Sequence, residues 1–95
     1  MSLATRRLRR RVQPHLGDGE QYQAAARDAS GIWWVVTDQA LLIADRFGHP
    51  QRRVPRGEIL EVQAADRRNV RIKTAHDGIL IGSLNSNAIG ESLAR

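Results

Sequence analysis

The sequence predicts a mainly β domain: a small seven-stranded barrel or sandwich, capped by a C-terminal helix and preceded by a short basic helix. About seven short apolar runs follow one another at close spacing, separated by turn residues, which is typical of all-β folds. A chain of 95 residues is long enough for one small domain with a single modest core. Near the end of the chain, the apolar side chains return to a helical spacing.

The N-terminal residues 1–13 are expected to form a basic amphipathic segment, distinct from a domain of residues 14–95. Pro14 disfavours helix at the residue before it and so ends the segment. Helical spacing places four side chains on one apolar stripe: Met1, Ala4, Leu8 and Val12. Five arginines surround that stripe: Arg6, Arg7, Arg9, Arg10 and Arg11. The first twelve residues hold these five of the 15 basic residues and no acid, so the other ten basic residues balance the ten acidic ones.

Residues 20–28 follow a glycine-rich turn and are expected to form a weak strand, in which Tyr22 and two alanines alternate with polar residues. The alanines make a helix a real competitor for this stretch. Asp18 and Glu20 lie beside the turn glycines, and we expect both carboxylates to be solvated.

The most apolar stretch, residues 31–45, is expected to form a tight hairpin of two strands, about 32–37 and 40–45. A single helix would be apolar all round and would carry five β-branched residues, which fit strands better. With Asp38 and Gln39 in the turn, Asp38 is expected to hydrogen-bond within that turn. Alternation then places five side chains on one face: Ile32, Trp34, Val36, Leu41 and Ile43.

The opposite face of the hairpin carries Trp33, Val35, Leu42 and Ala44. Left in water, this face would be an apolar patch of the kind that marks a protein interface. Trp33, Val35 and Leu42 are therefore candidate interface residues, and self-association would cover them. The alternative is that the N-terminal stripe or the C-terminal helix covers them within the chain.

The remaining elements complete the β pattern. Residues 51–55 are expected to form a short edge strand, because a proline stands at each end. Three further strands follow, at about 60–65, 70–74 and 79–84. Ser86 or Asn87 would cap the closing helix, in which Ile89 and Leu93 face inward.

The order of several short motifs resembles a known family. These motifs are Gly19-Glu20, Trp34 to Asp38, Leu41 to Ile43, Val54-Pro55, Ile59, Val62 and Asp77-Gly78. Over about residues 16–95 they resemble the bacterial pleckstrin-homology-like (PH-like) domains, relatives of the eukaryotic PH and GRAM folds. The resemblance implies a partly open seven-stranded barrel with a C-terminal helix, no catalytic centre, and a binding or scaffolding role. Some bacterial members assemble into rings.

The ligand contacts of the family are not carried over. Many eukaryotic relatives bind phosphoinositides through a basic cluster in the first strand loop, whereas this loop has only Arg27 with an acid beside it. Members often carry a basic residue shortly after the Thr-Asp pair, where this chain has Gln39 and Ala40.

No catalytic or metal-binding constellation is found in the sequence. His15, His49 and His76 are far apart and stand beside turn residues, so we expect ordinary exposed histidines. The glycine-rich turn at 17–19 lacks the Lys-Ser/Thr of a phosphate loop. The absence of cysteine excludes disulfides, iron–sulfur clusters and thiolate zinc sites. We therefore expect neither an enzyme nor a cofactor.

The predicted function is a non-catalytic binding or scaffolding module that contacts protein partners, with homo-oligomerisation as one form of contact. Its arginine arm would bind anionic membrane headgroups, with Leu8 and Val12 dipping into the bilayer. A second interpretation packs the stripe on the barrel and leaves the arginines in water. A third is a nucleic-acid-binding small barrel with an Arg-rich arm, which the neutral remainder of the chain disfavours. No stretch reaches the roughly 18 apolar residues that span a bilayer, and we expect a cytoplasmic location, or a peripheral one at the membrane.

Overall fold

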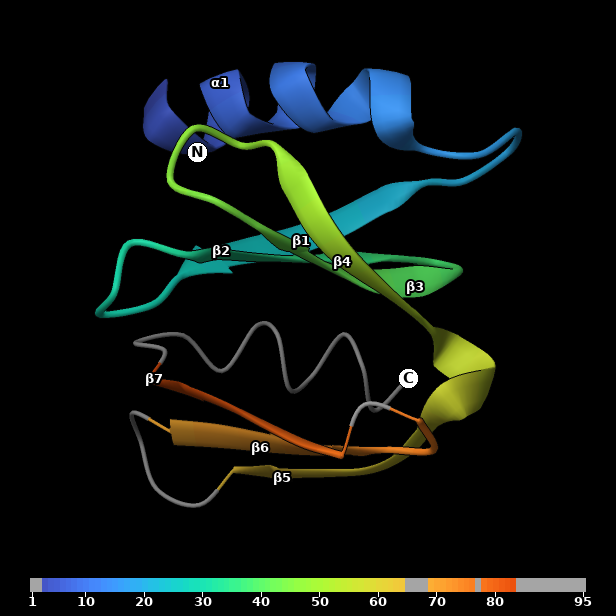
Figure 1. Ribbon diagram of the computed structural model, residues 1–95. Coiled ribbons are helices and arrows are strands. Elements are labelled where there is room, and N and C mark those ends of the chain that lie inside the picture. Colours follow the sequence, from blue (N-terminus) through green and yellow to red (C-terminus); the bar gives the residue numbers. More distant parts are fainter. Residues whose placement is uncertain (1–2, 65–68, 77, 84–95) are drawn as a thin grey trace.

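The computed structural model describes residues 3–64, 69–76 and 78–83, and in them the chain is mainly β (Figure 1). One α-helix comes first, α1 (Leu3–Val12), followed by a 3-10 turn at Gln13–His15. Seven strands follow: β1 (Tyr22–Arg27), β2 (Trp33–Thr37), β3 (Ala40–Ala44), β4 (Pro50–Pro55), β5 (Ile59–Ala64), β6 (Asn69–Thr74) and β7 (Ile79–Ser83). The predicted seven strands and N-terminal helix are confirmed. The predicted C-terminal helix, with Ser86, Asn87, Ile89 and Leu93, lies outside the described residues.

The strands form two antiparallel sheets, one in the order β1-β2-β3-β4 and one in the order β5-β6-β7. The 3-10 turn Arg56–Glu58 connects them. β4 lies at a sheet edge, as its flanking prolines predict. Residues 22–27 form a strand, and the competing helix is excluded there, because pairing with β2 places these residues in the sheet.

The described elements form three layers (Figure 1). α1 covers one face of the four-stranded sheet, and the three-stranded sheet lies against the other face. The core between the sheets is built from residues of both, chiefly Trp34, Val36, Leu41, Val54, Val70 and Ile72. Burial of such side chains contributes roughly 1.5–3 kcal/mol each, and this layer therefore holds the two sheets together.

The predicted hairpin has the expected register. Trp34 pairs with Ile43 and Val36 with Leu41, and these side chains belong to the core between the sheets. Ile32 does not join them, because β2 begins one residue later and Ile32 is exposed.

The hairpin turn is closed differently from the prediction. Thr37 Oγ1 accepts hydrogen bonds from the backbone amides of Gln39 and Ala40. The carboxylate of Asp38 instead accepts from the amide of Gln21, 2.7 Å away. Asp38 therefore ties the hairpin to the residue before β1, and the predicted hydrogen bond within its own turn is wrong.

Candidate anion-binding surface of the N-terminal helix

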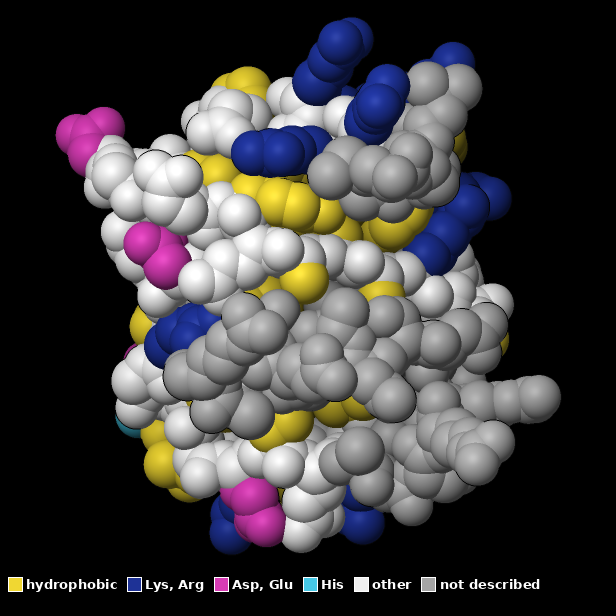
Figure 2. Space-filling model, turned by 180° about the vertical axis from the view of Figure 1, so that it is seen from behind, with side chains coloured by type: hydrophobic (Ala, Val, Ile, Leu, Met, Phe, Trp, Pro, Cys, Tyr) yellow, Lys and Arg dark blue, Asp and Glu magenta, His cyan; other side chains and the backbone are white. Residues whose placement is uncertain are grey.

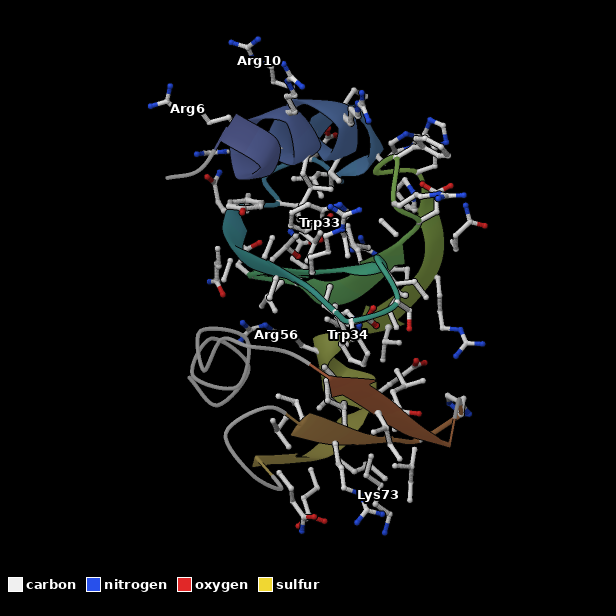
Figure 3. The ribbon with its side chains drawn as sticks, turned by 90° about the vertical axis from the view of Figure 1, so that its left-hand side faces the viewer. Arg6, Arg10, Trp33, Trp34, Arg56 and Lys73 are labelled. Carbon is white, nitrogen blue, oxygen red and sulfur yellow. The ribbon has the colours of Figure 1, made fainter. Side chains whose placement is uncertain are left out.

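α1 is fixed to the sheet by the last two residues of its apolar stripe. Leu8 and Val12 are 3% and 1% exposed and pack against the outer face of the hairpin. Figure 3 shows Trp33 between the helix and the four-stranded sheet, while Trp34 lies on the opposite side of that sheet. The prediction that Leu8 and Val12 dip into a bilayer is wrong for this arrangement, because both side chains are already buried within the chain.

The candidate interface residues lie under the same helix. Trp33, Val35 and Leu42 are 8%, 0% and 2% exposed, in one cluster with Leu8 and Val12. The sequence predicts that a second chain, the N-terminal stripe or the C-terminal helix covers this face. In the described residues, Leu8 and Val12 of the N-terminal stripe cover it. A contact of these three residues with another chain stays a prediction, and it would require α1 to leave the sheet.

The arginines of α1 are distributed around the buried stripe of the helix. Arg6, Arg7, Arg9, Arg10 and Arg11 are all exposed. Figure 2 shows basic side chains gathered over the helix, and Figure 3 shows Arg6 and Arg10 pointing away from the sheet. The helix has no acid in its first turn, and its last turn holds three arginines. Positive charge at this C-terminal end of the helix interacts favourably with the helix dipole.

One flank of α1 is open. Arg6, Arg9 and Arg10 border a groove of about 630 Å³ with the turn that follows the helix. The Arg9 guanidinium lies 5.0 Å from the centre of the Tyr22 ring, a cation–π distance. Burial raises the pKa of Tyr22 above its ordinary value of 10.0, although the charge of Arg9 opposes the rise. The phenol is therefore neutral at physiological pH and leaves the charge of this flank unchanged.

The other flank of α1 faces the loop after β3 and the adjoining ends of β1 and β2. Arg7 and Arg11 border a hollow of about 150 Å³, and Arg27 and Arg46 border it from the sheet side. Arg27 ends β1, and Arg46 belongs to the loop after β3. The sequence gives no local sign of this grouping, because the four arginines come from three separate segments. Only the docking of α1 brings them together.

Glu20 is the other charged group that the prediction misplaced. Its side chain is buried, with 4% of the residue exposed, whereas the sequence predicts a solvated carboxylate in a turn. Its carboxylate accepts hydrogen bonds from Thr37 Oγ1, from the Gly17 amide at 2.8 Å and from Arg53 Nη1 at 3.0 Å. Burial favours a raised pKa for Glu20, but these three donors and the Arg53 charge outweigh it, so its pKa lies below the ordinary value of 4.5. We assign this group a structural role, since it joins the turn before β1 to Thr37 of β2 and Arg53 of β4.

The histidines are exposed, as predicted. His49 lies 3.6 Å from Asp45, and His76 lies 3.7 Å from Glu58. Across residues 3–64, 69–76 and 78–83, no three His, Cys, Asp or Glu side chains are grouped as metal ligands would be. Within the same part of the chain, no helix is long and apolar enough to cross a membrane.

Two crystal structures share this architecture. A pleckstrin homology domain from Shewanella amazonensis SB2B superposes with a TM-score of 0.67 at 19% sequence identity, covering 93% of this chain and 93% of its own. A DUF1696 family protein with a pleckstrin-homology domain from Shewanella loihica PV-4 gives 0.68 at 20% identity, covering 99% and 95%. The fold is PH-like.

The comparison confirms, at the level of the fold, the resemblance that the sequence motifs indicate. No protein-family model and no curated protein matches the sequence. A shared fold hosts many functions, so the function of this PH-like chain is argued from its own surface.

Proposed function

We propose that this PH-like chain is a non-catalytic binding module that docks on anionic surfaces through the arginines of α1. The observation that carries the proposal is the position of α1. Leu8 and Val12 of its apolar stripe are buried against the sheet, while its five arginines are exposed to solvent. The helix contains no acidic residue that would neutralise them. The division into a basic segment of residues 1–13 and a domain of residues 14–95 belongs to the same proposal. In it, the segment supplies charge and the domain supplies a rigid support.

The docking is electrostatic, because Leu8 and Val12, the stripe side chains that the structure describes, are buried against the sheet. A basic residue near an anionic membrane surface contributes about 1 kcal/mol. Five arginines on one helix are therefore enough for measurable binding to anionic lipid. The binding falls as ionic strength rises, because exposed charges are screened over about 10 Å at 0.1 M salt.

Protein partners, including a second copy of the chain, form the other part of the proposal. The support comes from β7, where Ile79 and Ile81 are 54% and 63% exposed beside Lys73 and Arg71 of the neighbouring strand. Apolar side chains rimmed by charge are typical of protein contacts. Light scattering tests self-association, and a mass of one 10.6 kDa chain at high concentration argues against a second copy.

Co-sedimentation with vesicles tests the docking. We expect the chain to bind vesicles that contain phosphatidylserine and not neutral phosphatidylcholine vesicles. Replacing Arg6 and Arg10 together by glutamine should weaken binding about ten- to thirtyfold. The matched control replaces Arg52 and Arg71, two exposed arginines on β4 and β6, and leaves α1 intact.

The outcomes separate the classes of partner. Equal loss in both double variants would show that net charge alone, and not the helix, determines the affinity. Absence of vesicle binding at low salt, with binding to generic DNA, would overturn the proposal in favour of the nucleic-acid interpretation. The slope of the logarithm of the DNA-binding constant against the logarithm of the salt concentration would then report the number of phosphates contacted.

A further inference from the structure

The outer face of the three-stranded sheet carries a different kind of side chain on each strand. Alternate positions of these strands belong to the core between the sheets: Val62, Val70, Ile72 and Leu80. The positions between them therefore point outward. They are all exposed, and we call them the outer-sheet surface: Glu61 and Gln63 on β5, Arg71 and Lys73 on β6, and Ile79 and Ile81 on β7. Figure 3 shows Lys73 pointing away from the four-stranded sheet, at the opposite end of the molecule from Arg6 and Arg10.

The two cations of this surface have no acidic partner among the described residues. Strand pairing places Glu61 opposite Lys73. The carboxylate of Glu61 instead accepts a hydrogen bond from Gln63 Nε2 on its own strand, 2.7 Å away. No ion pair in the described part of the chain includes Arg71 or Lys73. Both cations are therefore available to carboxylates from outside.

An apolar row lies directly beside this cationic row. Ile79 is paired with Lys73, and Ile81 is paired with Arg71. The two isoleucines are 54% and 63% exposed, and the surface between Ile79 and the neighbouring rows is hollowed by about 90 Å³. Paired strands lie about 4.8 Å apart, so the two rows are parallel and close together. A partner that covers both rows needs apolar side chains beside a line of acids.

We propose that the outer-sheet surface docks an amphipathic helix of a protein partner, in which an acidic stripe runs beside an apolar one. Residues two apart on a strand are separated by about 6.7 Å, and residues i and i+4 of a helix by about 6 Å. Apolar residues at i and i+4 therefore lie over Ile79 and Ile81, while acids of the neighbouring stripe reach Lys73 and Arg71. The inference rests on the part of the proposed function that assigns protein partners to the chain, and it does not depend on the docking through α1.

The charges of the chain disfavour a second copy as the occupant. A two-fold contact would bring the same surface onto itself. That surface holds two cations and one acid in each copy, so the two copies would repel each other there. Nor can α1 of a second copy supply the acidic stripe, because that helix carries five arginines and no acid.

The probe is a fluorescently labelled synthetic peptide of about 18 residues, because shorter isolated helices are marginally stable in water. Its leucines are placed at i, i+4 and i+7, with glutamates along one side of this stripe. Binding to the full chain is followed by fluorescence anisotropy. One control peptide has the same composition in scrambled order, and another has lysine in place of glutamate. We expect the full chain to bind the first peptide and neither control.

Two double variants test the two rows separately. Replacing Arg71 and Lys73 by glutamine should weaken peptide binding about two- to thirtyfold, the loss expected for two exposed ion pairs. Replacing Ile79 and Ile81 by threonine should weaken it about tenfold or more, because apolar contact area is lost. Threonine keeps the β-branched shape that suits a strand. Thermal melting shows whether each variant folds.

Matched control variants change the same kinds of side chain elsewhere. Replacing Arg6 and Arg10 by glutamine removes two positive charges from α1, and Phe47→Thr removes a side chain that is 55% exposed in the loop after β3. Both should leave peptide binding within about twofold, because these residues lie outside the outer-sheet surface. The same Arg6 and Arg10 variant should lose vesicle binding, which the Arg71 and Lys73 variant should keep.

The outcomes separate this inference from the docking through α1. Peptide binding that is lost in both outer-sheet variants and kept in both controls supports the inference, even where no vesicle is bound. Absence of peptide binding, equal binding of the scrambled peptide, or equal loss in the Arg6 and Arg10 variant overturns it and leaves the docking in place. Equal loss of vesicle binding in the Arg71 and Lys73 variant assigns the surface to a membrane. Self-association that competes with the peptide and is abolished with Ile79 and Ile81 assigns it to a second copy, and either result overturns the inference.

Discussion

Leu8→Ala tests whether α1 is a fixed part of the molecule. Leu8 is 3% exposed and packs with Trp33, Val35 and Leu42. Truncating a buried leucine costs about 2–5 kcal/mol, and the lower half of that range is expected here because a terminal helix can detach before the sheets unfold. Urea unfolding followed by circular dichroism measures the loss. Arg10→Ala, an exposed change on the same helix, should shift stability by less than about 0.5 kcal/mol.

Tryptophan fluorescence separates local detachment from global unfolding. If Leu8→Ala loosens the helix, Trp33 gains water and its emission shifts to longer wavelength, whereas Trp34 stays in the core between the sheets. The shift should vanish when Trp33 is replaced by phenylalanine. If Leu8→Ala lowers the free energy of unfolding by less than about 1 kcal/mol and leaves the tryptophan emission unchanged, the packing of α1 on which the proposed docking depends is refuted. Aggregation of the variant, seen by light scattering, would support the covered face as a latent interface.

Two further predictions concern the frame around the site. Glu20→Gln should cost about 1–3 kcal/mol at neutral pH, because it removes the charge that Arg53 and its other donors face. The pKa of Glu20 is lower in the folded state than its unfolded value near 4.5. The stabilisation is therefore present above the unfolded pKa and is lost as the pH falls through the folded pKa. In acid, the free energies of unfolding of the two proteins, measured in urea, should become equal. Gly48→Ala should cost about 1–2 kcal/mol, because φ is +86° and the new Cβ meets Arg11. Gly57→Ala, with open space around it, should change stability by less than about 0.5 kcal/mol.

The strands were predictable because their signal is local. The alternation of residues 32–45 determines the faces of the hairpin, and the register that places Trp34 opposite Ile43 follows from a turn at Asp38-Gln39. The element that covers the outer face of the hairpin was not predictable, because the N-terminal stripe, the C-terminal helix or a second chain could each bury its apolar side chains. Asp38 and Glu20 show the other limit: their partners, Gln21 and Arg53, are chosen by how segments meet in space.

The arginines show the same limit in the site. The sequence marks the five on α1 by their density, yet it treats them as one group. The docked helix divides them, with Arg6, Arg9 and Arg10 beside an open groove and Arg7 and Arg11 beside a hollow. Arg27 and Arg46 join the second group only because Trp33 and Leu8 hold the helix over them. One stripe of apolar contacts therefore divides a uniform basic segment between two surfaces, an open groove beside the turn after α1 and a hollow against the loop after β3.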